Sequence, residues 1–237
     1  MNSKHRVVTA ERFAEGMTVD QYLTYIGTPE NLEREAGWML GPQRVDFSAV
    51  LRERYERTGL SQPQVDAIRW LAAQPNGPAK ILMISEEWSS DCRRDVPIVG
   101  RLAELGGLEL RIFPRDGDKA SSGPRANPAE SPNADLVNEF LYARDGQTYQ
   151  SVPVVAFFTR DFAYLYHYVE LPAICHKDRL ISAIFAARSG ETRNEAFDRG
   201  IREWRSVQDS PFFRLWGSAA IDEMLSGLYE RIVVGSR

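Results

Sequence analysis

Hydrophobic and polar positions divide the chain into helical segments near both ends and a middle part that contains strands. After Ser61, apolar residues recur with helical spacing through residues 65–72, which indicates one buried helix face. Residues 45–57 follow a looser version of the same pattern. Thr18 and Ser61 each precede a Gln by three positions, the spacing of a capping box at a helix start. We therefore expect the first eighty residues to be mainly helical.

The middle of the chain alternates between strand and helix patterns. Residues 81–84 form a continuous apolar run directly after a break rich in Pro and Gly, as expected of a strand buried on both faces. Residues 96–103 place apolar side chains on one helical face, and residues 108–113 alternate as in a strand. Strands joined by a helix in this way pair in parallel with a right-handed crossover.

A segment without periodicity separates this unit from an apolar hairpin. Residues 114–132 are rich in Pro, Gly, Ser, Asp and Asn and are predicted to form a long, mobile loop. Apolar residues between 136 and 141 predict a short helix that ends near Gly146. Residues 152–158 and 162–169 then predict the two strands of an antiparallel hairpin. The rest of the chain reads as helical, through a final amphipathic helix at residues 221–228.

The composition is that of an ordinary globular protein and excludes several classes of function. The chain has 237 residues, of which 43% are hydrophobic and 26% charged, and its net charge is -4. The overall charge therefore gives no reason to expect a nucleic-acid partner or an acidic membrane surface. No apolar run approaches the roughly 20 residues that span a bilayer, and the N-terminal sequence has no signal-peptide pattern. We expect a cytoplasmic protein without a membrane partner.

The two cysteines, Cys92 and Cys175, are too few for a disulfide framework or a four-cysteine metal site. Zinc-ligand residue types do gather around Cys175, with His167, His176 and Asp178. Their spacing matches no compact zinc signature, so we expect no metal and no cofactor.

Two sequence motifs resemble those of a known superfamily. Trp88-Ser89-Ser90-Asp91-Cys92 lies where the first buried strand meets its helix, the place where thioredoxin-like proteins carry W-C-x-x-C. Ser151-Val152-Pro153, at the start of the hairpin, is similar to the Thr-Val-Pro of glutaredoxins. The order of elements over residues 61–188 is also that of thioredoxin. The chain resembles the thioredoxin-like superfamily, and most of all bacterial members with extra N-terminal helices and a W-C-x-D-C motif.

The resemblance implies an α/β thioredoxin-like fold with a central mixed sheet flanked by helices. The expected division is an N-terminal helical extension at residues 1–60, a thioredoxin-like core at 61–190, and C-terminal helices at 191–237 that pack on the same domain. The resemblance also implies a cis peptide bond before Pro153, in van der Waals contact with the Trp88 to Cys92 turn. In this family, the peptide before that proline holds the backbone of a substrate.

Ser89 stands where the family has its nucleophilic cysteine, so the usual dithiol–disulfide cycle is not available within this motif. In the first account of the site, Cys92 is the nucleophile, and the helix N-terminus and neighbouring Arg93 favour its thiolate. The protein would be a thiol-dependent redox protein acting on a protein disulfide or a small thiol such as glutathione or mycothiol. This leading hypothesis assigns catalytic roles to Cys92 and Ser89, and substrate binding to Trp88, Arg93, Val152 and Pro153.

Two other accounts of Cys92 stay open. In the second, Cys92 is buried under the helix, and burial raises the pKa of its thiol and makes it inert. The protein would then be a non-catalytic binding module with a groove beside Trp88, Ser89 and Pro153 for a peptide or small ligand. In the third, Cys92 pairs with Cys175, which requires their Cα atoms to lie within about 7 Å. A peroxidase version of the first account lacks the proline that peroxiredoxins have seven residues before their cysteine.

Two acidic residues, Glu86 and Glu87, come directly before the motif. A buried carboxylate near the active cysteine would accept a proton. Solvated charges at the end of the strand are an interpretation with at least equal support.

Overall fold

The sheet is mixed and follows the expected strand–helix–strand unit. The structure is a computed structural model that describes residues 7–36 and 43–235. Its strands are β1 (Lys80–Ser85), β2 (Glu109–Pro114), β3 (Tyr142–Arg144), β4 (Gln147–Tyr149), β5 (Val154–Phe158) and β6 (Tyr164–Val169). The main sheet has the order β2-β1-β5-β6. Strand β1 pairs in parallel with β2 and antiparallel with β5, and β5 pairs antiparallel with β6. The predicted crossover unit and hairpin are confirmed.

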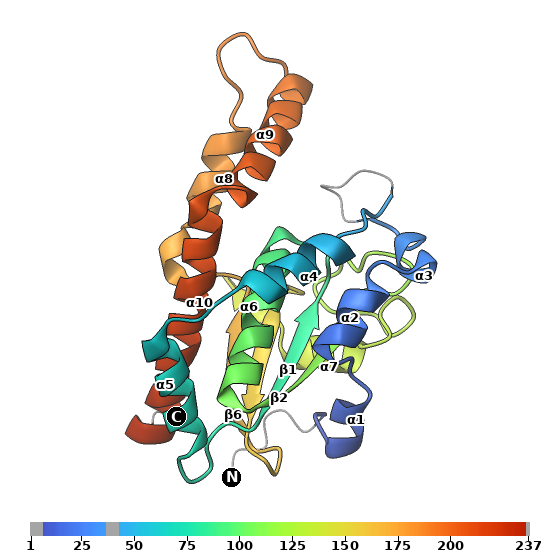
Figure 1. Ribbon diagram of the computed structural model, residues 1–237. Coiled ribbons are helices and arrows are strands. Elements are labelled where there is room, and N and C mark those ends of the chain that lie inside the picture. Colours follow the sequence, from blue (N-terminus) through green and yellow to red (C-terminus); the bar gives the residue numbers. More distant parts are fainter. Residues whose placement is uncertain (1–6, 37–42, 236–237) are drawn as a thin grey trace.

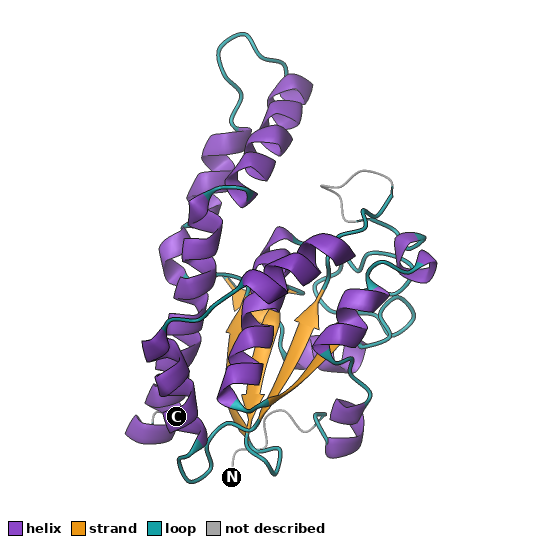
Figure 2. Cartoon of the chain, viewed as in Figure 1, coloured by secondary structure: helices purple, strands orange, loops and turns teal. Residues whose placement is uncertain are grey.

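The helices form layers on both faces of this sheet (Figures 1 and 2). The bounds of the helices are α1 (Ala10–Ala14), α2 (Val19–Tyr25), α3 (Pro29–Leu32), α4 (Ser48–Arg57), α5 (Gln62–Ala72), α6 (Ser90–Gly106), α7 (Ala134–Glu139), α8 (Lys177–Phe185), α9 (Arg193–Gln208) and α10 (Pro211–Tyr229). A 3₁₀ turn (Ala173–Cys175) precedes α8, and a π-helical turn (Glu230–Val234) follows α10. The predicted mixed sheet flanked by helices is confirmed.

Alternation along β1 assigns its side chains to two separate cores. Ile81 and Met83 belong to a large buried cluster with side chains from α2, α4, α5, α6 and α10. Leu82 and Ile84 point to the opposite face, where Phe13 and residues of α7 form a second cluster. Since successive side chains of a strand face opposite ways, a fully apolar β1 is what a sheet covered on both faces requires. The proposed three-part division of the chain stays a prediction, although helices from all three parts join the large cluster.

Local sequence signals account for several helix boundaries. The capping boxes of Thr18 with Gln21 and of Ser61 with Gln64 are both formed, which confirms these two helix starts. Helix α6 ends at Gly106 and is capped by Gly107, whose φ of 70° lies in the left-handed region that glycine adopts without a steric penalty.

The segment between α7 and β5 differs from the expectation. In place of a short helix running close to Gly146, the chain forms the two short exposed strands β3 and β4 around a turn at Asp145. Apart from Pro114, the last residue of β2, the 114–132 segment contains no helix or strand, as expected. It is nevertheless anchored, because Arg115, Asp116 and Ser131 within it are buried.

Helices α8 and α9 pack against each other and extend away from the sheet, next to the N-terminal end of α10 (Figure 1). Helix α10 runs back along α6 and α5. Lys177, the first residue of α8, ties this pair of helices to the core through ion pairs to Asp91 of α6 at 2.6 Å and to Glu170 at 3.2 Å. The inner side of the α8–α9 pair is thereby held beside the start of α6.

Candidate functional site

The Trp88 to Cys92 motif forms the turn between β1 and α6. Ser89 is the N-cap residue of α6, and its carbonyl oxygen accepts a hydrogen bond from the Arg93 amide at 3.1 Å. Cys92 therefore lies in the first turn of the helix, as the sequence predicts. The direction in which each side chain points decides what this turn can do.

The Cys92 thiol points into the protein and has no exposed surface. It belongs to the same apolar cluster as Ile84 and Val152, and the Glu86 amide donates a hydrogen bond to Sγ at 3.3 Å. Burial raises the pKa of the thiol to about 12, although hydrogen bonds involving the Glu86 backbone and the Ser89 hydroxyl favour the thiolate. The expected lowering of this pKa is therefore wrong, and the geometry does not support Cys92 as a nucleophile.

The two arginines after Cys92 direct their hydrogen bonds to other groups. Arg93 donates from Nη1 to the carbonyl oxygens of Glu87 and Trp88, both at 2.7 Å. Arg94 forms buried ion pairs with Asp91 at 3.0 Å and with Asp95 at 2.7 Å. Arg93 therefore stabilises the turn at the start of α6, and Arg94 stabilises the carboxylates of the buried core.

A cleft of about 710 Å³ opens on the other side of the turn. Its walls come from α4, the motif turn, the loop after β2, the residues before β5, and the α8–α9 pair. Of the residues that the sequence assigned to a site, Trp88, Ser89, Arg93 and Val152 line this cleft, whereas Cys92 and Pro153 are not among the lining residues. The structure thus brings Ser89 and three of the four expected binding residues together at the cleft, without Pro153, and places the Cys92 thiol behind them.

The backbone before β5 forms one wall of the cleft. The peptide bond between Val152 and Pro153 is cis, and the Pro153 carbonyl accepts a hydrogen bond from the Glu170 amide at 2.8 Å. Within the described part of the chain, the N–H and C=O of Val152 have no hydrogen-bond partner. Two further polar atoms of the same wall, the hydroxyl of Ser121 and Oε1 of Gln150, are buried without a partner.

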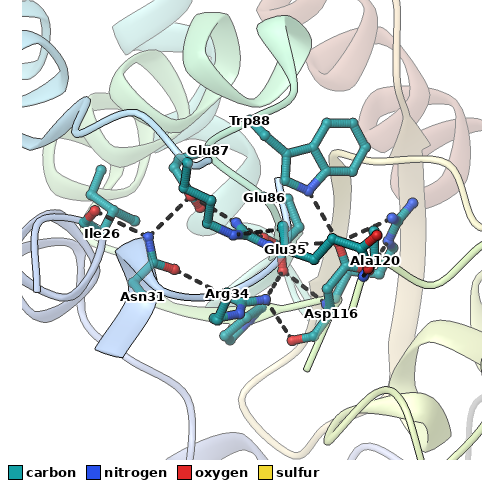
Figure 3. A network of polar contacts seen from close by, with 12 residues as sticks. Ile26, Asn31, Arg34, Glu35, Glu86, Glu87, Trp88, Asp116 and Ala120 are labelled. Carbon is teal, nitrogen blue, oxygen red and sulfur yellow. Dashed lines mark hydrogen bonds and ion pairs between the residues drawn. The ribbon is translucent and has the colours of Figure 1, made fainter. Parts of the chain in front are cut away.

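Glu86 and Glu87 are buried in a network of charges behind the cleft (Figure 3). The Glu86 carboxylate pairs with Arg34 and with Arg44, both at 2.9 Å, and accepts a hydrogen bond from the Asp116 amide at 2.8 Å. Glu87 pairs with Arg44 at 2.7 Å. Burial raises the pKa of Glu86, and the Arg34 charge opposes that shift. The interpretation of Glu86 and Glu87 as solvated charges is wrong, because two arginines of the N-terminal segment neutralise them.

The same network fixes the indole of Trp88. Its Nε1 donates to Asp116 Oδ2 at 3.0 Å (Figure 3). The Arg115 guanidinium lies 5.0 Å from the centre of the indole ring. Arg115 in turn pairs with Asp116 at 2.8 Å and donates to the carbonyl of Gln150 at 2.9 Å. Sequence reasoning missed this support, since Arg115 and Asp116 lie in a loop with no recognisable pattern.

The remaining sequence candidates lie outside the cleft. Cys92 and Cys175 are both free and buried, so the proposed pairing of the two cysteines is wrong.

Among residues 7–36 and 43–235, no group of three or more His, Cys, Asp or Glu side chains is placed to hold a metal ion. Nor does any helix in those ranges have the length and apolar character needed to cross a membrane.

The chain is similar to two solved structures and matches one family model. No curated protein matches the sequence. Two solved structures are similar to the chain: an HIV epitope-scaffold, with 17% identity, a TM-score of 0.46 and coverage of 96% of this chain and 98% of the scaffold, and a Pseudomonas aeruginosa protein of unknown function, with 16% identity, a TM-score of 0.44 and coverage of 87% and 99%. A family model described as Thioredoxin matches residues 48–183, more than half of the sequence. The chain therefore belongs to the thioredoxin family.

Proposed function

We propose that this protein is a non-redox member of the thioredoxin family that binds an extended polypeptide segment in the cleft beside Trp88 and Val152. The observation that carries the proposal is the placement of the two motif side chains, Ser89 and Cys92. A serine lies at the cleft, and the remaining thiol, Cys92, is fully buried behind it.

Thiol chemistry requires a thiolate that a substrate sulfur can approach. Cys92 has no exposed surface and a pKa raised to about 12, so neither condition holds. Ser89 lines the cleft, but a hydroxyl cannot form or exchange a disulfide. The chemistry that this site supports is therefore recognition rather than electron transfer.

The polar groups along the cleft wall favour a polypeptide ligand. An extended chain beside Val152 would pair with its free N–H and C=O as an added strand does, because main-chain groups of two extended segments complement each other. Trp88 and Phe47 supply apolar contact area. The cleft volume is within the range of roughly 300–1,000 Å³ that is common for ligand sites.

A random peptide library panned against the purified full-length protein tests this proposal. We expect the wild type to enrich peptides whose binding is lost in Ser89→Trp, which places a large side chain in the cleft, and retained in Cys92→Ala, which removes only the buried thiol. Hydrogen exchange at the Val152 amide should slow when an enriched peptide is added. Absence of enrichment, or binding that Ser89→Trp leaves intact, would contradict the proposed site. Binding that depends on Cys92 and persists as a mixed disulfide would favour the redox account.

A further inference from the structure

The charged side chains of the cleft are unequally paired. Its lining includes five basic and three acidic residues: Arg54, Arg93, Arg115, Lys177 and Arg205 against Asp91, Glu170 and Asp209. Lys177 is matched by Asp91 and Glu170, and Arg115 by the buried Asp116. Within the described residues, neither Arg54 nor Arg93 forms an ion pair of 4.0 Å or less, and the undescribed positions contain no Asp or Glu. One end of the cleft therefore carries excess positive charge.

Arg93 is the more deeply buried of these two arginines, with 5% of its surface exposed. Its hydrogen bonds go to neutral acceptors, two backbone carbonyls and Oε1 of Gln208 at 2.7 Å. Its guanidinium also lies 4.2 Å from the centre of the Phe47 ring. These contacts fix the plane of the guanidinium but do not neutralise its charge. Burial lowers the pKa of Arg93 to about 10, as expected of a cation without a carboxylate partner.

Arg54, on α4, brings a second such cation to the same end of the cleft. Its Nη1 is buried without any hydrogen-bond partner, and its guanidinium lies 5.6 Å from the centre of the Phe213 ring. Burial lowers the pKa of Arg54 as well, and the charges of Asp209 and Glu53 only partly offset that effect. The two guanidinium groups are close enough for the Arg54 charge to lower the pKa of Arg93. An anion placed between them would relieve both the mutual repulsion and the loss of solvation.

We infer that the Arg54–Arg93 end of the cleft is a carboxylate subsite, which takes an acidic side chain or the free C-terminus of the bound polypeptide. The inference rests on the proposed function and specifies the chemistry of its ligand. A guanidinium offers parallel N–H donors that match the two oxygens of a carboxylate, and such charge-assisted bonds are stronger than neutral ones. Peptides would then be held by main-chain pairing at Val152 and oriented by their acidic group between Arg54 and Arg93.

Binding of defined peptide pools tests the subsite. The pools are short random peptides, amidated at the C-terminus, in which one position is fixed as Glu, Gln or Lys; a further pool has a free C-terminal carboxylate. Affinity for the full-length protein is measured by fluorescence anisotropy for the wild type, Arg54→Gln and Arg57→Gln. Arg57 is a matched control, because it lies on α4 in an exposed pair with Glu53 and is not among the cleft-lining residues. Arg54 is chosen over Arg93 because Arg93 also holds the motif carbonyls.

We expect the wild type to bind the Glu pool about tenfold more tightly than the Gln pool, the effect of one charge-assisted contact. A gain for the free-carboxylate pool alone would identify the C-terminus as the source of the carboxylate. The preference should fall close to one in Arg54→Gln and persist in Arg57→Gln. In the wild type, acetate should compete with the preferred pool and acetamide should not, a measurement that does not depend on how well a variant folds.

Three results would overturn the inference. Equal binding of the Glu, Gln and free-carboxylate pools by the wild type, or a preference that Arg54→Gln leaves unchanged, would remove the subsite and leave the proposed peptide site standing. No binding by any pool would overturn the proposed function, and the subsite with it.

Discussion

Chemical labelling of Cys92 in the native state separates a binding protein from a redox protein. The perturbation is iodoacetamide added to the folded protein across a range of pH, with adducts located by peptide mass mapping. Only the thiolate reacts at an appreciable rate, and it must be reached by the reagent. The Cys92 thiol meets neither requirement, since it is fully buried and burial raises its pKa to about 12.

The expected protection follows from the two routes to reaction. Direct labelling is slowed about a thousandfold by the shift in pKa from 9.0 to about 12, because the thiolate fraction falls tenfold for each unit. Labelling through unfolding is slowed by the unfolding equilibrium, which at a stability of only about 5 kcal/mol is a factor of several thousand. Cys92 should therefore label at least about a thousandfold more slowly than a cysteine in a free peptide, and the rate should rise in urea together with unfolding.

Ser122→Cys provides the matched control, because Ser122 is exposed in the same cleft. Its thiol should label at close to the rate of a free peptide cysteine while Cys92 in the same protein stays protected. Native labelling of Cys92 within tenfold of that control, or a labelling rate that levels off between about pH 5 and pH 7, would show an accessible thiolate of lowered pKa. The burial argument, and the proposed function with it, would then be refuted.

Three further predictions test the groups around the motif. Between about pH 8 and pH 10, the free energy of unfolding should fall by about 1.4 kcal/mol more in the wild type than in Cys92→Ala. Folding raises the pKa of the Cys92 thiol, so stability is lost as the pH rises above the ordinary thiol pKa of 9.0. Equal decreases of the free energy of unfolding in urea titrations would contradict the raised pKa. Ser89→Cys should form a disulfide with Cys92 under oxidising conditions, since residues three positions apart at a helix start are neighbours; nonreducing peptide maps with two free thiols would disprove it. Glu86→Gln should lower the free energy of unfolding by about 3–5 kcal/mol, because Arg34 and Arg44 would lose the buried carboxylate with which they pair. A decrease below about 1 kcal/mol in urea unfolding would show that these ion pairs contribute little.

The parts of the fold that sequence predicts well are those that local patterns determine. The capping boxes at Thr18 and Ser61 need only residues within one helical turn, and both form. The continuous apolar run of β1 is also a local signal, because a strand covered on both faces has no polar side. The strands β3 and β4 were missed for the same physical reason, since their exposed side chains leave no hydrophobic periodicity to read.

The buried network shows what a single sequence does not reveal. From the sequence alone, the adjacent carboxylates of Glu86 and Glu87 are expected to be solvated unless their ion-pair partners are known. Those partners lie far away in the sequence. Arg34 and Arg44 precede Glu86 by 52 and 42 positions and belong to no repeating pattern. Their arrival at β1 depends on how the N-terminal segment packs, which is a property of the tertiary structure.

The direction of the Cys92 thiol, in contrast, had a signal in the sequence. Residues four and seven positions apart lie on one face of a helix, and Cys92 stands four positions before Val96 and seven before Val99. Both valines are fully buried on α6, and Cys92 begins their stripe. The helix periodicity therefore places the thiol on the buried face, whereas the motif alone suggests a reactive position.

Support for the cleft is independent of any thiol. Trp88 is held by Asp116 and covered by Arg115, and the Asp116 amide is held in turn by Glu86 within the Arg34–Glu86 ion pair. None of these contacts involves Cys92, so the cleft wall is fixed before a ligand arrives, and the entropy lost on binding falls mainly on the ligand. Redox chemistry would require this wall to open far enough to expose Sγ. Binding requires only that the wall stay closed, which is the state that the buried ion pairs stabilise.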